Sequence, residues 1–338
     1  PRSAQSTTSS CTTSVEIDGL GTDLEYGQSH TGGTTLRETT SKRYAWWEGS
    51  DANTGNPFGW GTVTLDDVHI FLRTDVLSKW DNDVVIERDS RIDLGHLDGG
   101  EKGENRFGTL TIGPNTLIME NPWGGGFNMD FAGLVLTDAA TGGTLDVRLP
   151  VTISGPTSGA GKLVATSTNL NNALYLSGAN GTHAGGTEVR NVKLFATAVN
   201  ALGNGDLLVD ANGTLNISAA QNVGDVQTDG TVTIAAGSGL VQTGAYSAGG
   251  GGFAPAITLE SGVELNVASI QAEGVTVNAG GQLTLRGASV TVSDVNSLSV
   301  ASGGAVDVMT NELRVHYGDE ASVFNDVLQW IDDGEIFS

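Results

Sequence analysis

The sequence is poor in the groups that cross-link a chain or give its surface positive charge. Cys11 is the only cysteine among 338 residues, so its thiol is either inert or bonded to another chain. Lys and Arg number 16 against 39 Asp and Glu, which gives a formal net charge of −23. Such a surface repels phosphate groups, so we expect neither nucleic acid nor acidic membrane surfaces as partners. The same charge could recruit Ca²⁺, and no other cofactor is indicated.

Long apolar runs are also absent. No stretch approaches the roughly 18 apolar residues that a membrane-spanning helix needs, so no membrane insertion is expected. Hydrophobic residues make up 38% of the chain and aromatic residues 6%, which predicts an aliphatic core. The chain begins at Pro1 and not at a methionine, which fits a processed, exported protein.

What the sequence does contain is a series of short alternating segments, each behind a small-residue turn. Alternation of apolar and polar residues over four to six positions is typical of a β-strand. The glycine ahead of each segment is expected to supply the positive φ of a sharp corner. The segments are GGTLDV (142–147), NGTLNI (212–217), DGTVTI (229–234), SGVELNV (261–267), GGQLTL (280–285) and GGAVDV (303–308), with an earlier relative in FGTLTI (107–112).

The spacing of these segments predicts a solenoid. The second glycines of the last five units fall at 213, 230, 262, 281 and 304, a period near 20 with one long gap. That gap holds GAYSAGGGGFAP (244–255), which we interpret as a loop. The predicted fold is all-β, a right-handed parallel β-helix with its strands stacked about 4.8 Å apart. A sandwich of hairpins is the alternative, because Asn-Gly and Asp-Gly are also good hairpin turns.

The alternation also predicts which residues lie inside the coils. Leu283, Leu285, Val275 and Val277 are expected to face inward. The outward positions are expected to hold polar side chains, among them Thr276, Thr284 and Asn216.

One segment of the chain carries a more specific pattern. Residues 174–218 contain, in order, LSGAN (176–180), GGT (185–187), ALGNG (201–205) and GTL (213–215). This pattern resembles the autotransporter-associated β-strand repeat. The resemblance implies a right-handed β-helix in a secreted or surface-displayed bacterial protein, and it implies no activity.

The chain divides by composition into four regions. Residues 1–19 form a Ser/Thr-rich arm, and 20–131 form an irregular β region with 12 of the 20 aromatic residues, either the first coils or a cap. The β-helix is expected over 132–318, followed by a helical cap or docking segment over 319–338. In that segment residues 320–334 have one apolar face at helical spacing, with Asp319 as the N-cap and Gly334 at the end.

The ends of a β-helix leave backbone N–H and C=O groups unpaired, ready to pair with another chain. We therefore predict a non-enzymatic extracellular structural protein. It would assemble with itself into a filament, matrix or surface layer, by end-to-end contacts or by exchange of the N-terminal arm. The alternative for the arm is that it folds back on its own solenoid. The residues expected to mediate assembly are Cys11, Val15, Ile17, Val323, Phe324, Val327, Leu328 and Ile331.

Two other functions stay open. An adhesin could stack cell-surface glycans on Trp46, Trp47 and Trp60 in the polar loop 43–61, although these rings could equally pack over the end of the solenoid. A polysaccharide lyase or glycosidase would need carboxylates gathered beside an acid or base. The candidates for that role are Asp66 and Asp67 with His69, and Asp81 with Asp83.

Solvated strand or turn residues are the simpler interpretation of those carboxylates. The stretch RIDLGHLDGGE (91–101) raises the same choice for a cation. Asp93, Asp98 and Glu101 are weak candidates for a metal site there, since Gly-flanked Asp is ordinarily turn chemistry.

Overall fold

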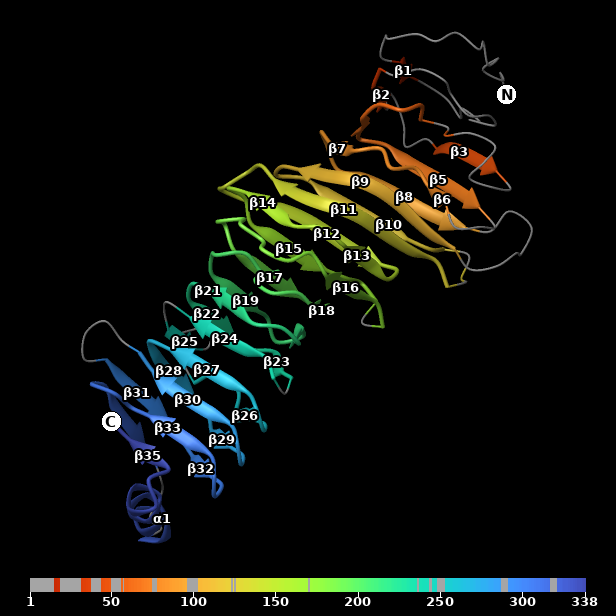
Figure 1. Ribbon diagram of the computed structural model, residues 1–338. Helices are drawn as coiled ribbons and strands as arrows, with labels where there is room; N and C mark the ends of the chain where they lie inside the picture. Colours follow the sequence, from red (N-terminus) through yellow and green to blue (C-terminus); the bar gives the residue numbers. More distant parts are fainter. Residues whose placement is uncertain are drawn as a thin grey trace. The chain divides into compact units, whose positions relative to one another are not determined.

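The computed structural model describes residues 15–18, 32–37, 44–49, 56, 58–74, 78–95, 103–122, 124, 126–169, 171–235, 237–242, 245–247, 253–286, 291–316 and 321–338. Within these ranges the side chains of 15–18, 44–49, 73–74, 241–242 and 321–324 are left outside the description. The chain forms two compact units, Pro1–Gly178 and Ala179–Ser338. Each unit is a stack of parallel strands (Figure 1).

The first unit has two parallel sheets, and the chain passes between them in turn. Sheet A contains, in spatial order, β1 (Val15–Asp18), β2 (Thr34–Arg37), β4 (Val63–Asp66), β7 (Val84–Ile86), β9 (Glu104–Ile112), β11 (Asn128–Leu136), β13 (Val151–Ile153) and β16 (Ala173–Leu176). The short strands β6 (Ser78–Lys79) and β14 (Thr157–Gly159) pair with β9 and β11. Sheet B contains β3 (Tyr44–Gly49), β5 (His69–Thr74), β8 (Ser90–Gly95), β10 (Thr116–Glu120), β12 (Gly143–Arg148) and β15 (Leu163–Thr166).

The strands of the second unit form the parallel sheets C, D, E and F. Sheet C contains β18 (Lys193–Ala196), β20 (Thr214–Ile217) and β23 (Thr231–Ile234), and sheet D contains β17 (Thr187–Arg190), β19 (Leu207–Val209), β22 (Val226–Thr228), β25 (Ala245–Ser247), β28 (Ser269–Ala272), β31 (Val292–Val295) and β34 (Glu312–Val315). Sheet E contains β21 (Gln221–Val223), β24 (Gly239–Gln242), β27 (Glu264–Val267), β30 (Gln282–Leu285), β33 (Ala305–Asp307) and β35 (Ile336–Phe337). Sheet F contains β26 (Ile257–Leu259), β29 (Val275–Val277) and β32 (Leu298–Val300).

These stacks confirm the predicted parallel β-solenoid. Within a sheet, successive strands pair in parallel with their counterparts, at separations from 17 residues between Thr214 and Thr231 to 30 between Val306 and Ile336. The strand pairs described are parallel, so the hairpin sandwich is wrong. The boundary expected at 131/132 falls inside β11, which pairs with β9 within sheet A.

The core is built as the alternation predicts. Leu283, Leu285, Val275 and Val277 are all buried. Thr284 lies on the outer side, but it is buried between its register partners in β27 and β33.

Aromatic rings stack in the core of the first unit. Phe58, Trp80, Phe107 and Phe131 follow one another with ring centroids 6.1, 6.5 and 5.7 Å apart. The stack explains where several aromatic side chains of region 20–131 lie, since rings on consecutive coils pack in one column.

The corners confirm the expected glycine chemistry in part. Gly262 has the predicted positive φ, +76°, and in the Gly280–Gly281 pair the first glycine has it, at +80°. Gly213 is not among the glycines with a positive φ. A Cβ at Gly213 would lie 2.5 Å from the Val189 carbonyl oxygen, so this glycine permits the close approach of two coils. FGTLTI is not a corner at all, because its residues lie within β9.

Two segments interpreted as loops contain strands. Residues 44–49 form β3, which pairs with β5. Residues 245–247 form β25, and Tyr246 is buried in the core. The long glycine gap therefore has another cause: Gly230 precedes a strand of sheet C, whereas Gly262 precedes a strand of sheet E.

The helix α1 (Ala321–Asp332) confirms the predicted C-terminal helix. It ends as expected at Gly334, with φ +74° and hydrogen bonds from Gly334 N to the Ile331 carbonyl and from Glu335 N to the Trp330 carbonyl. This pair of bonds is a Schellman motif. The predicted N-cap, Asp319, lies outside the described residues. No helix in the part that the structure describes has the length and hydrophobicity needed to cross a membrane.

Candidate functional site

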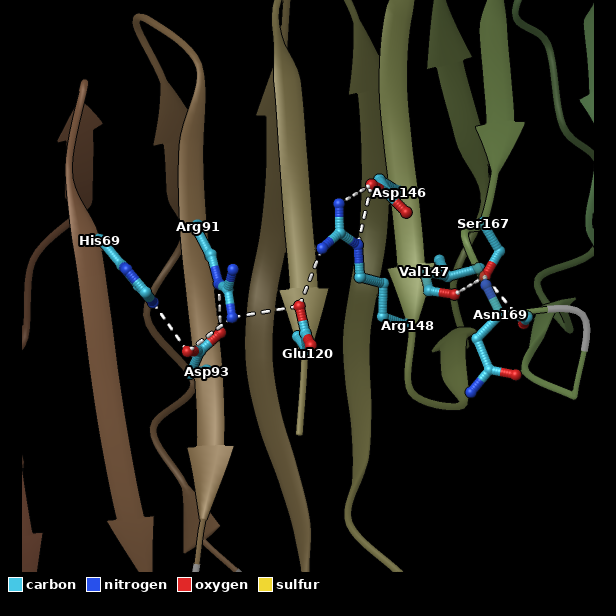
Figure 2. Close-up of polar contacts among 9 residues, drawn as sticks. All are labelled: His69, Arg91, Asp93, Glu120, Asp146, Val147, Arg148, Ser167 and Asn169. Atoms are coloured by element: carbon cyan, nitrogen blue, oxygen red, sulfur yellow. Dashed lines mark hydrogen bonds and ion pairs between the residues drawn. The ribbon is translucent and has the colours of Figure 1, made fainter. Parts of the chain in front are cut away.

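A ladder of charged side chains crosses four strands of sheet B in the first unit (Figure 2). At one end, His69 Nε2 on β5 lies 2.7 Å from Asp93 Oδ2 on β8. Arg91 Nε donates to Asp93 Oδ1 at 2.6 Å, and its Nη2 lies 3.1 Å from Glu120 Oε2 on β10. Asp93 is buried by these two partners, so its charge is compensated within the ladder.

The ladder continues from Glu120 to β12. Arg148 Nη1 donates to Glu120 Oε2 at 3.0 Å, while its Nη2 donates to Asp146 Oδ2 at 2.7 Å. The hydrogen bond with Asp146 raises the pKa of the Arg148 guanidinium. Beyond it, Ser167 Oγ donates to the Val147 carbonyl oxygen at 2.6 Å and so reaches back to the previous coil.

The chemistry of this ladder is that of a brace between coils. Each of its three carboxylates is held by an arginine, and Glu120 is shared between two of them. The ladder thus links β5, β8, β10 and β12 through side chains in addition to their backbone hydrogen bonds.

The carboxylates considered for catalysis are separated by the fold. Asp66 is buried between Arg37 and Arg88, and the hydrogen bond from Arg88 lowers the pKa of its carboxyl group. Asp67 adopts a φ of +56° and is exposed, while His69 faces Asp93 on the next coil. The expected grouping of Asp67 with His69 is therefore wrong.

The second catalytic candidate pair is also divided. Asp83 Oδ1 accepts the backbone N–H of Thr109 at 2.7 Å. Asp81 Oδ1 instead lies 3.7 Å from Arg106 Nε. Both carboxylates therefore serve the junction with β9.

Of the three residues considered for a cation site, only Asp93 lies in the part of the chain that the structure describes. Asp93 belongs to the ladder, and Asp98 and Glu101 lie outside the described residues. Across the described ranges no three His, Cys, Asp or Glu side chains group in a way that could hold a metal ion.

The tryptophans expected to contact glycans differ in position. Trp60 is 71% exposed, the largest exposure among the large hydrophobic side chains described. Trp46 and Trp47 lie in β3, in register with Phe71 and Leu72, and their side chains are outside the description.

The histidine of the repeat-like segment is a core residue. His183 is fully buried, and its Nε2 lies 3.0 Å from Thr187 Oγ1. The Thr187 hydroxyl donates to the Leu202 carbonyl oxygen, so Nε2 carries the hydrogen that Thr187 accepts. Burial lowers the pKa of His183 to about 4, which keeps the ring neutral near pH 7.

The C-terminal end of the second unit presents apolar side chains to solvent. The described large hydrophobic residues that are exposed are Trp60, Val199, Val292, Met309, Leu328, Ile331 and Phe337, and five of these seven lie beyond residue 290. These five side chains belong to the last coils and to the helix and strand that follow them. Strand β34 has a free edge, because it pairs only with β31 among the described strands.

The residues predicted to mediate assembly fall partly on this surface. Leu328 and Ile331 on α1 are 44% and 50% exposed, and Val327 is half-buried. The predicted apolar face of the helix is therefore not covered at these two positions. Val323 and Phe324 lie in α1, and Val15 and Ile17 lie in β1, but their side chains are outside the description, as is Cys11 altogether.

The charged ladder was not predicted from the sequence, although the spacing of its charged residues indicates part of it. An arginine and a carboxylate stand two residues apart within a strand in Arg91–Asp93, Asp146–Arg148, Glu188–Arg190 and Glu312–Arg314. Residues two apart share one face of a strand, so each pair forms an ion pair on the outer face.

Comparison with known proteins gave no relative. No family model, no curated protein and no solved structure matches the chain. The resemblance of residues 174–218 to the autotransporter-associated repeat therefore stays a prediction.

Proposed function

We propose that the chain is a non-enzymatic structural protein that assembles with copies of itself, outside a bacterial cell, into a filament, matrix or surface layer. The observation that carries this proposal is the C-terminal end of the second unit. There an unpaired strand edge lies in the same region as exposed apolar side chains. Paired interior strands bury their inward residues, as Ser293 and Val295 of β31 do, whereas Leu313 and Val315 of β34 are only half-buried.

The free energy available at such an end favours association. A free parallel edge offers backbone hydrogen bonds in register, and burial of apolar area contributes about 25 cal/mol per Å². The net charge of −23 opposes association by repulsion, so assembly should strengthen as salt screens that charge. The extracellular bacterial location rests on the resemblance of residues 174–218 alone.

Sedimentation velocity over a range of protein concentrations, followed by negative-stain microscopy, tests this proposal. We expect the mean mass to rise with protein concentration and with salt, and elongated or layered assemblies to be visible on the grid. A single monomeric species at every concentration and salt would contradict it.

A glycan-binding adhesin is the second candidate, and the exposure of Trp60 favours it. An exposed indole offers an apolar face on which a sugar ring can stack. Binding to a glycan array that is lost in Trp60→Ala would support this function. Binding that is unchanged in that variant would show that Trp60 takes no part in glycan binding.

A further inference from the structure

The outer face of β34 carries an arginine and a carboxylate, as strands of the ladder do, but β34 is the last described strand of its sheet. In the ladder of sheet B, Arg91 and Arg148 each hold one carboxylate on their own strand and reach Glu120 on a neighbouring strand. Arg314 holds Glu312 on its own strand, with Nε 2.7 Å from Oε1. Its side chain is 54% exposed, and no described strand follows β34.

The geometry of the ladder defines what a strand added to β34 should contain. It should be about four residues long and parallel, with apolar residues opposite Leu313 and Val315 and a carboxylate opposite Arg314. A second carboxylate one register position beyond Val315 would face His316, which already lies 2.9 Å from Asp294.

Strand β1 of this same chain meets each condition. It is a four-residue strand with the sequence Val15-Glu16-Ile17-Asp18, preceded by Ser14. Its register with β2 pairs positions 15 and 17 with the buried Thr34 and Leu36, and position 16 with the less buried Thr35. Among the described strands β1 pairs only with β2, on one of its two edges.

We propose, on the basis of the proposed self-assembly, that β1 of a second copy adds in parallel to the free edge of β34. The register places Val15, Glu16 and Ile17 of the incoming copy opposite Leu313, Arg314 and Val315. Asp18 then falls opposite His316. The contact joins the first unit of one molecule to the second unit of another, so it is heterologous and can repeat from one molecule to the next.

A charge-exchange experiment tests this pairing in the full chain. Arg314→Glu alone places two carboxylates opposite each other, and Glu16→Arg alone places two guanidinium groups opposite each other. Each single variant should weaken self-association at least about tenfold. An equimolar mixture of the two variants should assemble like the wild type, because every contact between unlike chains again joins Arg to Glu.

Two controls separate this register from general effects of charge. Arg190→Glu changes an arginine that is 51% exposed and paired with Glu188 on its own strand, but it lies on β17, away from the free edge. It should leave association within about twofold of wild type. Glu48→Arg probes β3, whose only partner among the described strands is β5, and should also have little effect.

The outcomes separate the pairing from the proposed function. Wild-type protein that stays monomeric overturns both. Assembly that is insensitive to Arg314→Glu and Glu16→Arg, or a mixture that fails to restore it, overturns the pairing and leaves self-assembly standing. Rescue of Arg314→Glu by Glu48→Arg in place of Glu16→Arg would assign the edge to β3.

Discussion

Acidification should destabilise the second unit through His183. The ring is fully buried and neutral, with a pKa of about 4, whereas an unfolded histidine titrates near 6.5. Between these two pH values the histidine is protonated in the unfolded chain but not in the folded chain. The contribution of His183 to the free energy of unfolding is therefore fully present above about pH 6.5 and declines as the pH falls towards 4. The gap between the two pKa values corresponds to about 3 kcal/mol of unfolding free energy.

His183→Gln isolates this contribution. Glutamine keeps an N–H donor within reach of Thr187 and carries no titratable group, so its packing penalty is the same at every pH. Urea unfolding followed by circular dichroism should show wild type more stable than the variant at pH 7, with the difference shrinking by about 3 kcal/mol at pH 4. Carboxylates titrate in both proteins and cancel from the difference.

The comparison carries its own control, because the difference between the two proteins should be constant between pH 7 and 8, where histidine is neutral in both states. A difference that is equally constant down to pH 4 would refute the assignment of His183 as a buried neutral group. A measured NMR pKa near 6.5 for this ring would refute it independently.

Three further experiments with substituted chains test the packing, the ladder and the exposed surface. Gly203→Ala should lower the unfolding free energy by about 2 kcal/mol or more, since its Cβ would lie 2.5 Å from a buried histidine ring at a φ of +77°, measurable by urea unfolding. Asp93→Asn should cost about 2 kcal/mol by the same assay, because it leaves a histidine and an arginine facing a neutral amide, while the exposed Asp67→Asn should cost less than about 0.5 kcal/mol. Equal costs for the two would refute the bracing role of the ladder. The double variant Leu328→Ser with Ile331→Ser should unfold as the wild type does but self-associate more weakly in sedimentation, whereas unchanged association would exclude this face from the contact.

The solenoid could be predicted from the sequence because its signal is local. Apolar and polar residues alternate within each strand, so Leu283 and Val275 could be placed inside from their own neighbourhoods. The helix and its end at Gly334 were predictable for the same reason, since spacing and capping act within a few residues.

The failures concern positions that depend on the coil above or below. Gly230 and Gly262 look alike in sequence, yet they serve sheets on different sides, which local pattern does not specify. Tyr246 lies in a glycine-rich stretch, and its burial follows from strands that lie 20 and 24 residues away, at Val226 and Ile270. Thr284 is outward by alternation, but neighbouring coils cover it.

The charged ladder was hidden for a related reason. Arg91 and Asp93 are visible as a pair within one strand, but their link to Glu120 depends on the register between β8 and β10. That register becomes known only when the coils are stacked. Ion pairs within strands were therefore readable from the sequence, while the brace between strands was not.

Hydrogen–deuterium exchange as a function of protein concentration tests the central claim most directly. The Glu312 amide already donates to the Thr291 carbonyl oxygen on the β31 side, so the amides of Leu313 and Val315 point to the free edge of β34. If molecules join through this edge, the amides of Leu313 and Val315 should gain protection as concentration rises, while those of the interior strand 187–190 should not change. Exchange at Leu313 and Val315 that is independent of concentration, under conditions in which the mass of the particles increases, would contradict assembly through this edge.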